Sequence, residues 1–528
     1  MRDIFHLPST LMRIRTLASL LFLPATLPSQ SLRDQVHAWR EAREPQIIRE
    51  FAELLAIPNV ASDSANIWRN ARHITAMLER RGVSTRILEN GKWPPAVYGE
   101  LKTPGGPGGP GATRTIVVYA HYDGQPVDPG EWQGGAPWSA QLREQRGKAW
   151  VDIALPASGR LNPEARIFAR GAGDDKAPII AILNALDAIK AAGRRPTINL
   201  KFFFEGEEEA GSAHLEELLQ RNATLLKADA WLFCDGPSHA SRQLQVVFGV
   251  RGVMGLELTV YGPARALHSG HYGNWAPNPG MLLADLVTSM RDVDGRILVK
   301  NFYDDVVPPT AAELAAVRAL PRVDSALKSE LLLGGTEAND ALLAERIMLP
   351  ALNLRGMRVG QVEELAANAV PVEAKASIDF RLVPNQTPEH IRQLVEAHLQ
   401  GNGWFITHAA ATDAERLGHR KVVRLTWEGG YESSRTSMEL PAATALTGAL
   451  DEMLGKPVLR VPTLGGSLPT YLFSRTLGAP LVILPIANHD DNQHAKDENL
   501  RLQNLWDGID AFAAVMTRMD AFWPRVTP

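Results

Sequence analysis

Apolar runs alternate with helix-like stretches over the first half of the chain. Three apolar runs have the composition of strands, at residues 115–120, 198–205 and 230–235. Between the first two lies 177–193, an apolar stretch of helical length that ends at glycine. Strands that alternate with helices are typical of a parallel sheet covered by helices, so we expect an α/β fold.

A different pattern begins near residue 249. Apolar and polar residues alternate at 255–262 and 373–384, which predicts strands with one buried face and one solvent-exposed face. Such alternation favours an antiparallel sheet in a separate α+β domain. The first pattern then returns, with an apolar run at 480–487 and an amphipathic stretch near 502–519. We therefore expect the second domain to be an insertion into the first.

These patterns and the N-terminal residues predict four segments. Residues 1–30 contain a basic start, a short apolar run and then small polar residues, which is the layout of a signal peptide. With either Met1 or Met12 as the initiator, this layout predicts a secreted or periplasmic protein. The other segments are a catalytic domain in two parts and the domain inserted between them, at 31–248, 421–528 and 249–420, respectively.

Composition and charge narrow the classes of partner. The 528 residues are 45% hydrophobic and 22% charged, and the formal net charge is −4. These values are ordinary for a globular protein and favour neither nucleic acid nor an anionic membrane as a partner. The apolar run of the leader, 17–27, is shorter than the roughly 20 residues of a membrane-spanning helix. The single cysteine, Cys234, excludes an intramolecular disulfide.

Potential metal ligands follow each of the three early strands. His121 and Asp123 follow the first, four glutamates between Glu205 and Glu209 follow the second, and the third ends on Asp235. The carboxyl ends of strands in open α/β sheets form the ligand crevice. Each group alone is more simply a surface hydrogen bond or a solvated acidic face. Together, at three strand ends, they favour one shared site.

Two further groups of acidic residues and histidines extend this pattern. Asp174 and Asp175 precede the helix-like stretch, where helix capping is the simpler alternative. A polar segment after the last apolar run contains His489, Asp490, Asp491, His494, Asp497 and Glu498. His, Asp and Glu without Cys suit Zn²⁺, Mn²⁺ or Co²⁺ rather than a closed structural zinc site. Converging carboxylates repel one another, and a pair of metal ions removes this repulsion.

These motifs resemble those of the co-catalytic zinc exopeptidases, which include carnosinase-type dipeptidases, acetylornithine deacetylase and succinyl-diaminopimelate desuccinylase. The resemblance is carried, in order, by AHYDGQPVDPGEW, RGAGDDKAP, EGEEEAGS, HSGHYGNWAPNP, DFRLVPNQTPE and HAKDE. The dipeptidase branch of the family fits best. The resemblance implies a catalytic domain with a mixed, mostly parallel sheet covered by helices and an inserted α+β domain that serves as dimerisation domain and lid.

The resemblance also implies two zinc ions per subunit, with Mn²⁺ or Co²⁺ as alternatives. One ion would be held by His121, Asp174 and Asp235. The other would be held by Asp174, Glu209 and His494, so that Asp174 bridges the two.

Two other residues of these motifs would support the chemistry. Asp123 would orient the ring of His121. Glu208 would be the general base that takes a proton from a water between the metal ions and passes it to the leaving amine. In the family, the peptide bond between the residues that match Asp174 and Asp175 is cis.

Further residues would contact the substrate. His268 of the inserted domain would reach across a homodimer interface and stabilise the oxyanion in the other subunit. Arg381 would bind the terminal carboxylate of the substrate, because a guanidinium group suits bidentate pairing. Asn368, Gly466 and Ser467 are additional candidates for substrate contact.

The resemblance therefore implies a dipeptidase-like exopeptidase that acts on dipeptides or short peptides with a free carboxylate. An amidohydrolase that removes an acyl group from an amino acid is the alternative, and a non-catalytic binding protein that retains the fold is a third reading. The family has an arginine and a glutamate before Gly-Gly-Ser, where this chain has TLGGS at 463–467, so the substrate stays open. The additional residues between 138 and 167 are expected to form a loop near the site.

Overall fold

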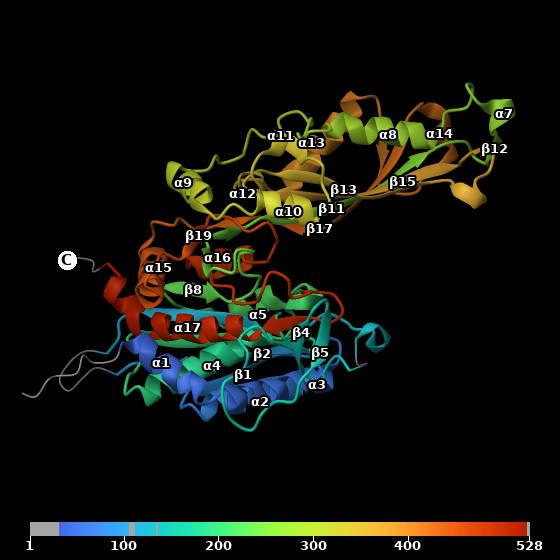
Figure 1. Cartoon of the computed structure of the whole chain (residues 1–528). Coiled ribbons are helices and arrows are strands. Elements are labelled where there is room, and N and C mark those ends of the chain that lie inside the picture. The colour runs from blue at the N-terminus through green and yellow to red at the C-terminus, as the bar shows by residue number, and fades with distance from the viewer. Residues whose placement is uncertain (1–30, 105–110, 134–135, 525–528) are drawn as a thin grey trace, which may run out of the picture.

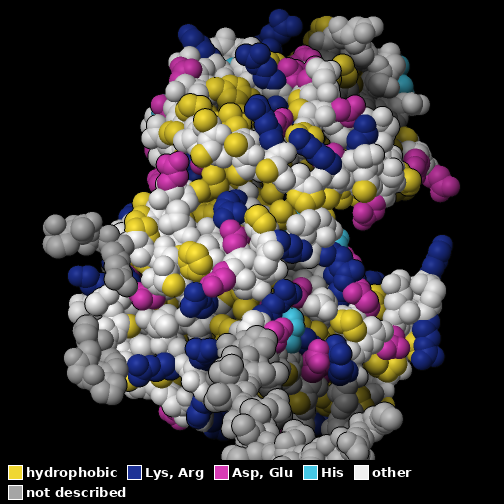
Figure 2. Space-filling model, turned by 60° about the vertical axis from the view of Figure 1, so that its left-hand side comes forward, with side chains coloured by type: hydrophobic (Ala, Val, Ile, Leu, Met, Phe, Trp, Pro, Cys, Tyr) yellow, Lys and Arg dark blue, Asp and Glu magenta, His cyan; other side chains and the backbone are white. Residues whose placement is uncertain are grey.

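A computed structural model describes residues 31–104, 111–133 and 136–524. The expected signal peptide, 1–30, lies outside the described residues. The described chain forms two parts, each with its own sheet and helices, which lie one above the other in Figure 1. A notch separates these parts on the face shown in Figure 2.

The larger part is built on an eight-stranded sheet with the order β1-β2-β7-β3-β8-β20-β9-β19. The four central strands, β7 to β20 in this order, are parallel, and β9 and β19 are parallel to each other. The remaining pairs are antiparallel, so the sheet is mixed and mostly parallel, as expected. The strands are β1 (Ser84–Asn90), β2 (Trp93–Leu101), β3 (Thr115–His121), β7 (Asn199–Glu205), β8 (Ala230–Phe233), β9 (Gln245–Val247), β19 (Leu459–Val461) and β20 (Leu481–Ile483).

Helices cover both faces of this sheet, as Figure 1 shows. Successive residues of a strand point to opposite faces, and β3 supplies one side chain to each of two cores. Val118 packs in the core beneath α4 and α17, whereas Tyr119 packs in the core beneath α5 and α16. The helices of this part are α1 (Leu32–Glu41), α2 (Glu44–Leu55), α3 (Ser64–Glu79), α4 (Lys176–Ala191), α5 (Leu215–Arg221), α6 (Ala223–Leu226), α15 (Pro441–Leu454), α16 (Tyr471–Leu477) and α17 (Leu502–Phe522).

A four-stranded sheet, β21-β6-β4-β5, occupies the region that was expected as a loop. β4 (Gln141–Arg146) and β5 (Ala149–Asp152) form an antiparallel hairpin, with Gly147 at the turn in the left-handed region. β4 also pairs with β6 (Arg166–Phe168), which pairs in turn with β21 (Asn499–Arg501). The expectation of a loop is wrong because these short, mostly polar strands pair with one another and, through β6, with the distant strand β21.

The smaller part contains a five-stranded sheet with the order β13-β15-β11-β17-β16, antiparallel except for the last pair. Apolar side chains of α8 (Pro279–Met290) and α13 (Pro388–Gly401) pack on one face, and the other face is polar. The sheet includes β17, which lies beyond residue 420, the expected end of the insertion. Its strands are β11 (Gly252–Tyr261), β13 (Ala351–Val359), β15 (Glu373–Leu382), β16 (Phe405–Thr407) and β17 (Val422–Tyr431).

Short elements complete the smaller part and its junctions. Among the described residues, no helix has the length and apolar character needed to cross a membrane. The short elements are β10 (Gly249–Val250), β12 (Leu267–His268), α7 (Ser269–Tyr272), α9 (Ala311–Ala319), α10 (Asp324–Glu330), α11 (Glu337–Asp340), α12 (Leu343–Ile347), β14 (Ala369–Val370), α14 (Asp413–Gly418) and β18 (Ser434–Arg435).

Candidate metal centre

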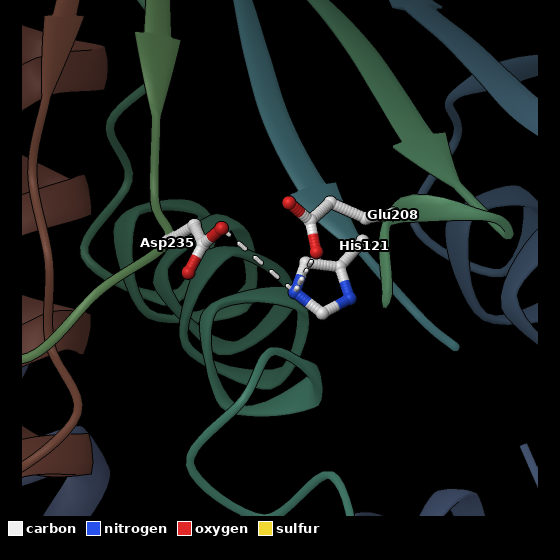
Figure 3. A group of neighbouring side chains, drawn as sticks. All are labelled: His121, Glu208 and Asp235. Carbon is white, nitrogen blue, oxygen red and sulfur yellow. Dashed lines mark ion pairs between the residues drawn. The ribbon is translucent and has the colours of Figure 1, made fainter. Parts of the chain in front are cut away.

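The carboxyl ends of β3, β7 and β8 bring three side chains together. His121 is the last residue of β3, Glu208 begins the short 3-10 helix η2 (Glu208–Ala210) after β7, and Asp235 follows β8. These side chains approach one another because β3 lies between β7 and β8 (Figure 3). Nε2 of His121 is 3.9 Å from Oδ2 of Asp235 and 4.0 Å from Oε2 of Glu208. The ligand atoms of these three residues lie within 4.8 Å of one another, close enough to hold a metal ion.

A second group whose ligand atoms lie equally close together contains Asp174, Glu209 and His494. Nε2 of His494 lies 3.2 Å from Oδ2 of Asp174 and 3.2 Å from Oε2 of Glu209. The other oxygen of Asp174, Oδ1, lies 2.9 Å from Nε2 of His121. The carboxylate of Asp174 therefore connects the two groups. The peptide bond between Asp174 and Asp175 is cis, as the resemblance implied.

The electrostatics of these groups favour bound positive charge. Burial, with the neighbouring carboxylate of Asp174, raises the pKa of Asp235 to about 7. Burial also raises the pKa of Glu208 well above its ordinary value, and the nearby carboxylates add to this effect. Hydrogen bonds with Asp174 and Glu209 raise the pKa of His494 to about 10. Imidazole nitrogens and carboxylate oxygens in such a field fit two divalent metal ions.

Asp123 fixes the turn that carries both glutamates. Its carboxylate is buried, Oδ1 accepts a hydrogen bond from the main-chain N–H of Glu208 (3.1 Å) and Oδ2 accepts one from that of Glu209 (3.0 Å). Oδ1 also lies 3.4 Å from Nδ1 of His121. The sequence indicated only the contact with His121. Asp123 thus positions residues of both groups at once.

The other two glutamates of the cluster point elsewhere. Oε2 of Glu205 accepts a hydrogen bond from the hydroxyl of Tyr119 (2.8 Å) in the core. Oε1 of Glu207 lies 2.7 Å from Nδ1 of His214. Glu208 and Glu209 are therefore the members of this acidic run that face the two groups.

Glu498, to which the sequence assigned no role, holds the loop before α4. Its buried carboxylate accepts hydrogen bonds from the main-chain N–H groups of Gly171 (3.0 Å), Gly173 (2.9 Å) and Asp174 (3.0 Å). Nη1 of Arg170 donates a further one, at 2.8 Å. The sequence showed Glu498 in an acidic segment and as the last residue of the HAKDE motif, but gave it no role, because contacts with main-chain amides leave no pattern of side chains.

Two glutamines also contact the groups and were missed. Nε2 of Gln493 donates to Oδ2 of Asp174, and Nε2 of Gln125 donates to Oε2 of Glu209, both at 2.7 Å. Gln493 immediately precedes His494, and Gln125 lies two positions after Asp123, the last residue of the His-x-Asp motif. Adjacency to a motif is the signal that would have identified them.

The residues expected to contact substrate fall into two places. Nη1 of Arg381 donates to Oγ of Ser467 (2.8 Å), so β15 of the smaller part meets the Gly-Gly-Ser loop of the larger part, which includes Gly466. His268 and Asn368 lie elsewhere, where β12 pairs with β14. Figure 1 places β12 and α7 at the far end of the smaller part. The structure does not bring this end to the metal centre of the same chain.

Comparisons with known proteins agree with this site. The sequence profile of peptidase family M20/M25/M40 matches residues 117–518. The Cys-Gly metallodipeptidase DUG1 of Saccharomyces cerevisiae is 25% identical over 498 residues, which cover 90% of this chain and 96% of that protein. Human Beta-Ala-His dipeptidase is 24% identical over 519 residues, covering 93% of this chain and 94% of that protein.

Solved structures show the same fold along most of the chain. The M20 family metallo-carboxypeptidase Sso-CP2 of Sulfolobus solfataricus superposes with a TM-score of 0.70 at 27% identity, covering 90% of this chain and 99% of that chain. Human carnosine dipeptidase 1 superposes with a TM-score of 0.69 at 21% identity, covering 94% of this chain and 100% of that chain.

These comparisons contradict the predicted location of the protein and show the family to which it belongs. The prediction of a secreted or periplasmic protein is contradicted, because the relatives that align along most of the chain are the Cys-Gly metallodipeptidases DUG1 of yeasts, and the segment on which it rested, 1–30, lies outside the described residues. The family profile spans most of the chain, including His121, Asp174, Glu208, Asp235 and His494. The chain is a metallopeptidase and belongs to peptidase family M20/M25/M40.

Proposed function

We propose that the chain is a metal-dependent dipeptidase that hydrolyses dipeptides or short peptides with a free carboxylate, with Glu208 as its general base. The observation that carries this proposal is the arrangement of two adjacent glutamates. Oε2 of Glu208 lies 4.0 Å from Nε2 of His121, whereas Oε2 of Glu209 lies 3.2 Å from Nε2 of His494, so Glu209 is the closer of the two to a histidine ligand. The relatives named as dipeptidases support the substrate class.

Two Zn²⁺ ions are the proposed cofactors, with Mn²⁺ or Co²⁺ as alternatives. His121, Asp174 and Asp235 would hold one ion, and Asp174, Glu209 and His494 would hold the other. The two oxygens of Asp174, which face different histidines, support its role as the shared ligand. Such ions, when bound, lower the pKa of water and polarise a carbonyl group.

Side chains of the protein would transfer the proton and bind the substrate. Glu208 accepts the proton of the attacking water at its carboxylate and transfers it to the leaving amine nitrogen. Burial, which raises the pKa of Glu208, suits this exchange because it favours the protonated form between the two transfers. Arg381, with Gly466 and Ser467, binds the terminal carboxylate and thereby orients the scissile bond.

A homodimer would bring the remote residues to a site. His268 and Asn368 lie at the end of the smaller part, away from the metal centre of the same chain, which supports a role at the centre of a second copy. Nearby apolar side chains are exposed, with Trp275 80%, Met281 67% and Leu365 73% accessible. β13 is an edge strand of the sheet, and edge strands pair readily with another chain. These features support dimerisation through the smaller part.

Mixing two inactive variants tests the action of His268 in trans. Glu208→Gln lacks the base and His268→Ala lacks the oxyanion donor. In a mixed dimer, one centre combines a native Glu208 with the native His268 of the other copy. We expect activity to return on mixing and exchange, and failure to return, with mixed dimers present by native mass spectrometry, contradicts the role of His268.

The division into domains follows the two sheets. We place the catalytic domain at 31–248 and after β17, with the dimerisation domain between them. The membership of β17 in the five-stranded sheet supports an end near residue 431 rather than 420.

A screen of substrates tests the proposed activity most simply. Dipeptides and N-acetyl amino acids are compared at equal concentration with Zn²⁺, Mn²⁺ or Co²⁺. We expect turnover of dipeptides to dominate, and dominant turnover of acylated amino acids contradicts the dipeptidase assignment while leaving the metal centre intact.

A further inference from the structure

Asp379 lies beside the arginine that is proposed to bind the substrate. It is two residues before Arg381 on β15, so both side chains project from the same face of the sheet. Nε of Arg381 donates to Oδ2 of Asp379 at 3.0 Å, and Nδ2 of Asn353 is 3.5 Å from the same oxygen. The side chain of Asp379 is 13% exposed, whereas that of Arg381 is 30% exposed. The carboxylate therefore supports the guanidinium group from beneath.

The guanidinium group of Arg381 is held on two of its three nitrogens. Asp379 binds Nε, and Oγ of Ser467 accepts from Nη1 at 2.8 Å. Oγ of Ser467 is itself 3.4 Å from the carbonyl oxygen of Gly252. Within the described residues, Nη2 has no hydrogen-bond partner. This arrangement leaves the outer edge of the guanidinium group for one ligand.

A second arginine lies beside this pair. Nε of Arg251 donates to the carbonyl oxygen of Gly465 at 3.0 Å, on the loop that also contacts Arg381. Burial and then the nearby Arg381 lower the pKa of Arg251 to about 10, so Arg251 stays charged at neutral pH. With two guanidinium groups and the carboxylate of Asp379, this end of the site has one net positive charge. The terminal carboxylate of a substrate, which carries one negative charge, would balance it.

The next charges on the same face are mostly negative. Nη2 of Arg355 lies 3.2 Å from Oε1 of Glu257 and 2.9 Å from Oε2 of Glu428, so one arginine serves two glutamates. Glu428 covers Gly255, the residue opposite Asp379 on β11. If a ligand of Arg381 carried a second acidic group, the carboxylates of Glu257 and Glu428 would repel it.

We propose that Asp379 is a positioning and specificity-determining residue of this peptidase. It fixes Arg381 through Nε, and it limits the positive charge of the carboxylate-binding end. The substrate class is then peptides whose C-terminal residue has a neutral or basic side chain, and acidic C-terminal residues are disfavoured. This inference rests on the proposed function, in which Arg381 binds the terminal carboxylate.

Two substitutions separate the two effects of Asp379. Asp379→Asn preserves shape and an acceptor for Nε but removes the charge. The wild type should prefer Ala-Asn over Ala-Asp in kcat/KM, and this preference should fall about tenfold in the variant. Asp379→Ala removes the support of Arg381, so KM for Ala-Asn should rise about tenfold while kcat changes less than about threefold. KM for the matching dipeptide amide should not change.

Glu373→Gln, with the same change of charge at the far end of β15, is the matched control and should behave as the wild type. Circular dichroism and melting temperature establish that each variant is folded. An unchanged Ala-Asn to Ala-Asp ratio in Asp379→Asn, or an unchanged KM in Asp379→Ala, overturns the inference while wild-type hydrolysis upholds the proposed function. Failure of the wild type to hydrolyse any dipeptide overturns both.

Discussion

Two buried carboxylates, those of Asp123 and Glu498, hold the main chain around the metal centre. Asp123 binds the N–H groups of Glu208 and Glu209, and Glu498 binds those of Gly171, Gly173 and Asp174. Each therefore determines where a ligand or the base lies, although neither belongs to the metal-binding groups. Hydrogen bonds from donors to a charged acceptor are the stronger kind, so these two residues make the centre rigid.

Replacement of Glu498 by glutamine should weaken metal binding. The amide offers one oxygen where the carboxylate offers two, and its NH₂ group faces N–H donors, so about 1–3 kcal/mol of stability is lost. Loss of such a supporting residue costs roughly 10–100-fold in metal affinity. Isothermal titration with Zn²⁺ measures this change, with Asp497→Asn as the neighbouring control. Native affinity in Glu498→Gln would show that the loop is held by other contacts.

At the scale of elements, the turn after β7 is placed by contacts from β2 and from the residues after β3. A Cβ atom added to Gly206 would lie 2.5 Å from the hydroxyl oxygen and 2.6 Å from Cζ of Tyr122, and 3.0 Å from the carbonyl oxygen of Pro95. The hydroxyl of Tyr122 donates to that same carbonyl. The absence of a side chain at Gly206 thus lets the turn approach the strands that support it.

Gly206→Ala should therefore displace the turn that carries Glu208. We expect a loss of about 1–3 kcal/mol in the free energy of unfolding, the typical cost of overpacking, together with lower kcat. Gly401→Ala, where an added Cβ meets nothing within 4 Å, is the control. Denaturant unfolding and steady-state kinetics measure both variants, and equal stability of the two would mean that Tyr122 gives way without cost.

Asp490 joins two strands of the four-stranded sheet by charge. Burial opposes its ionisation, but hydrogen bonds and charges from Arg166 of β6, Asn488 and Arg501 of β21 lower the pKa of Asp490 to about 2. Because the folded-state pKa is below the unfolded value, Asp490 stabilises the fold above about pH 4. This stabilisation is lost as the pH falls toward 2, and solvent screening keeps it modest because the side chain is 41% exposed.

Asp490→Asn should accordingly reduce the free energy of unfolding at pH 6 and have a smaller effect at pH 3. Urea unfolding at both values measures the difference. A penalty that is equal at the two values would show that the ion pairs of Asp490 do not contribute to stability.

The four central strands of the large sheet, β3, β7, β8 and β20, were predictable because an apolar run indicates a buried strand, whereas β1, β2, β9 and β19 were not predicted. The strand ends also located His121 and Asp235, since topology brings these ends to one edge. Spacing could not separate Glu208 from Glu209, and the resemblance supplied that distinction. β4 and β5 were missed because their polar residues lack an apolar run, and the amide contacts of Asp123 and Glu498 were missed because they involve the main chain.

At the scale of the whole molecule, the metal centre draws its ligands from segments that are far apart in the chain. The loop before α4, the ends of β3, β7 and β8, and the segment before β21 all supply a carboxylate or a histidine. Without metal ions, burial and then the repulsion from the carboxylate of Asp174 raise the pKa of Asp235. Metal ions should therefore stabilise the fold globally rather than only the site.

Removal of metal should lower the melting temperature of the whole chain. Binding of a ligand to the folded state alone adds about 2.7 kcal/mol when its concentration is 100 times Kd. Calorimetry before and after dialysis against a chelator measures this, with re-addition of Zn²⁺ as the control. An unchanged melting temperature would contradict the convergence of the ligands on metal ions.

In the proposed mechanism, Glu208 moves protons and its neighbour Glu209 binds metal. The most direct measurement compares kcat and zinc content in the wild type, in Glu208→Gln and in Glu217→Gln, an exposed control on α5. We predict that Glu208→Gln retains its zinc while kcat falls by about 10²–10⁴-fold, the contribution of a general base. Native kcat in Glu208→Gln would contradict the mechanism, and loss of zinc in that variant would assign Glu208 to the metal instead.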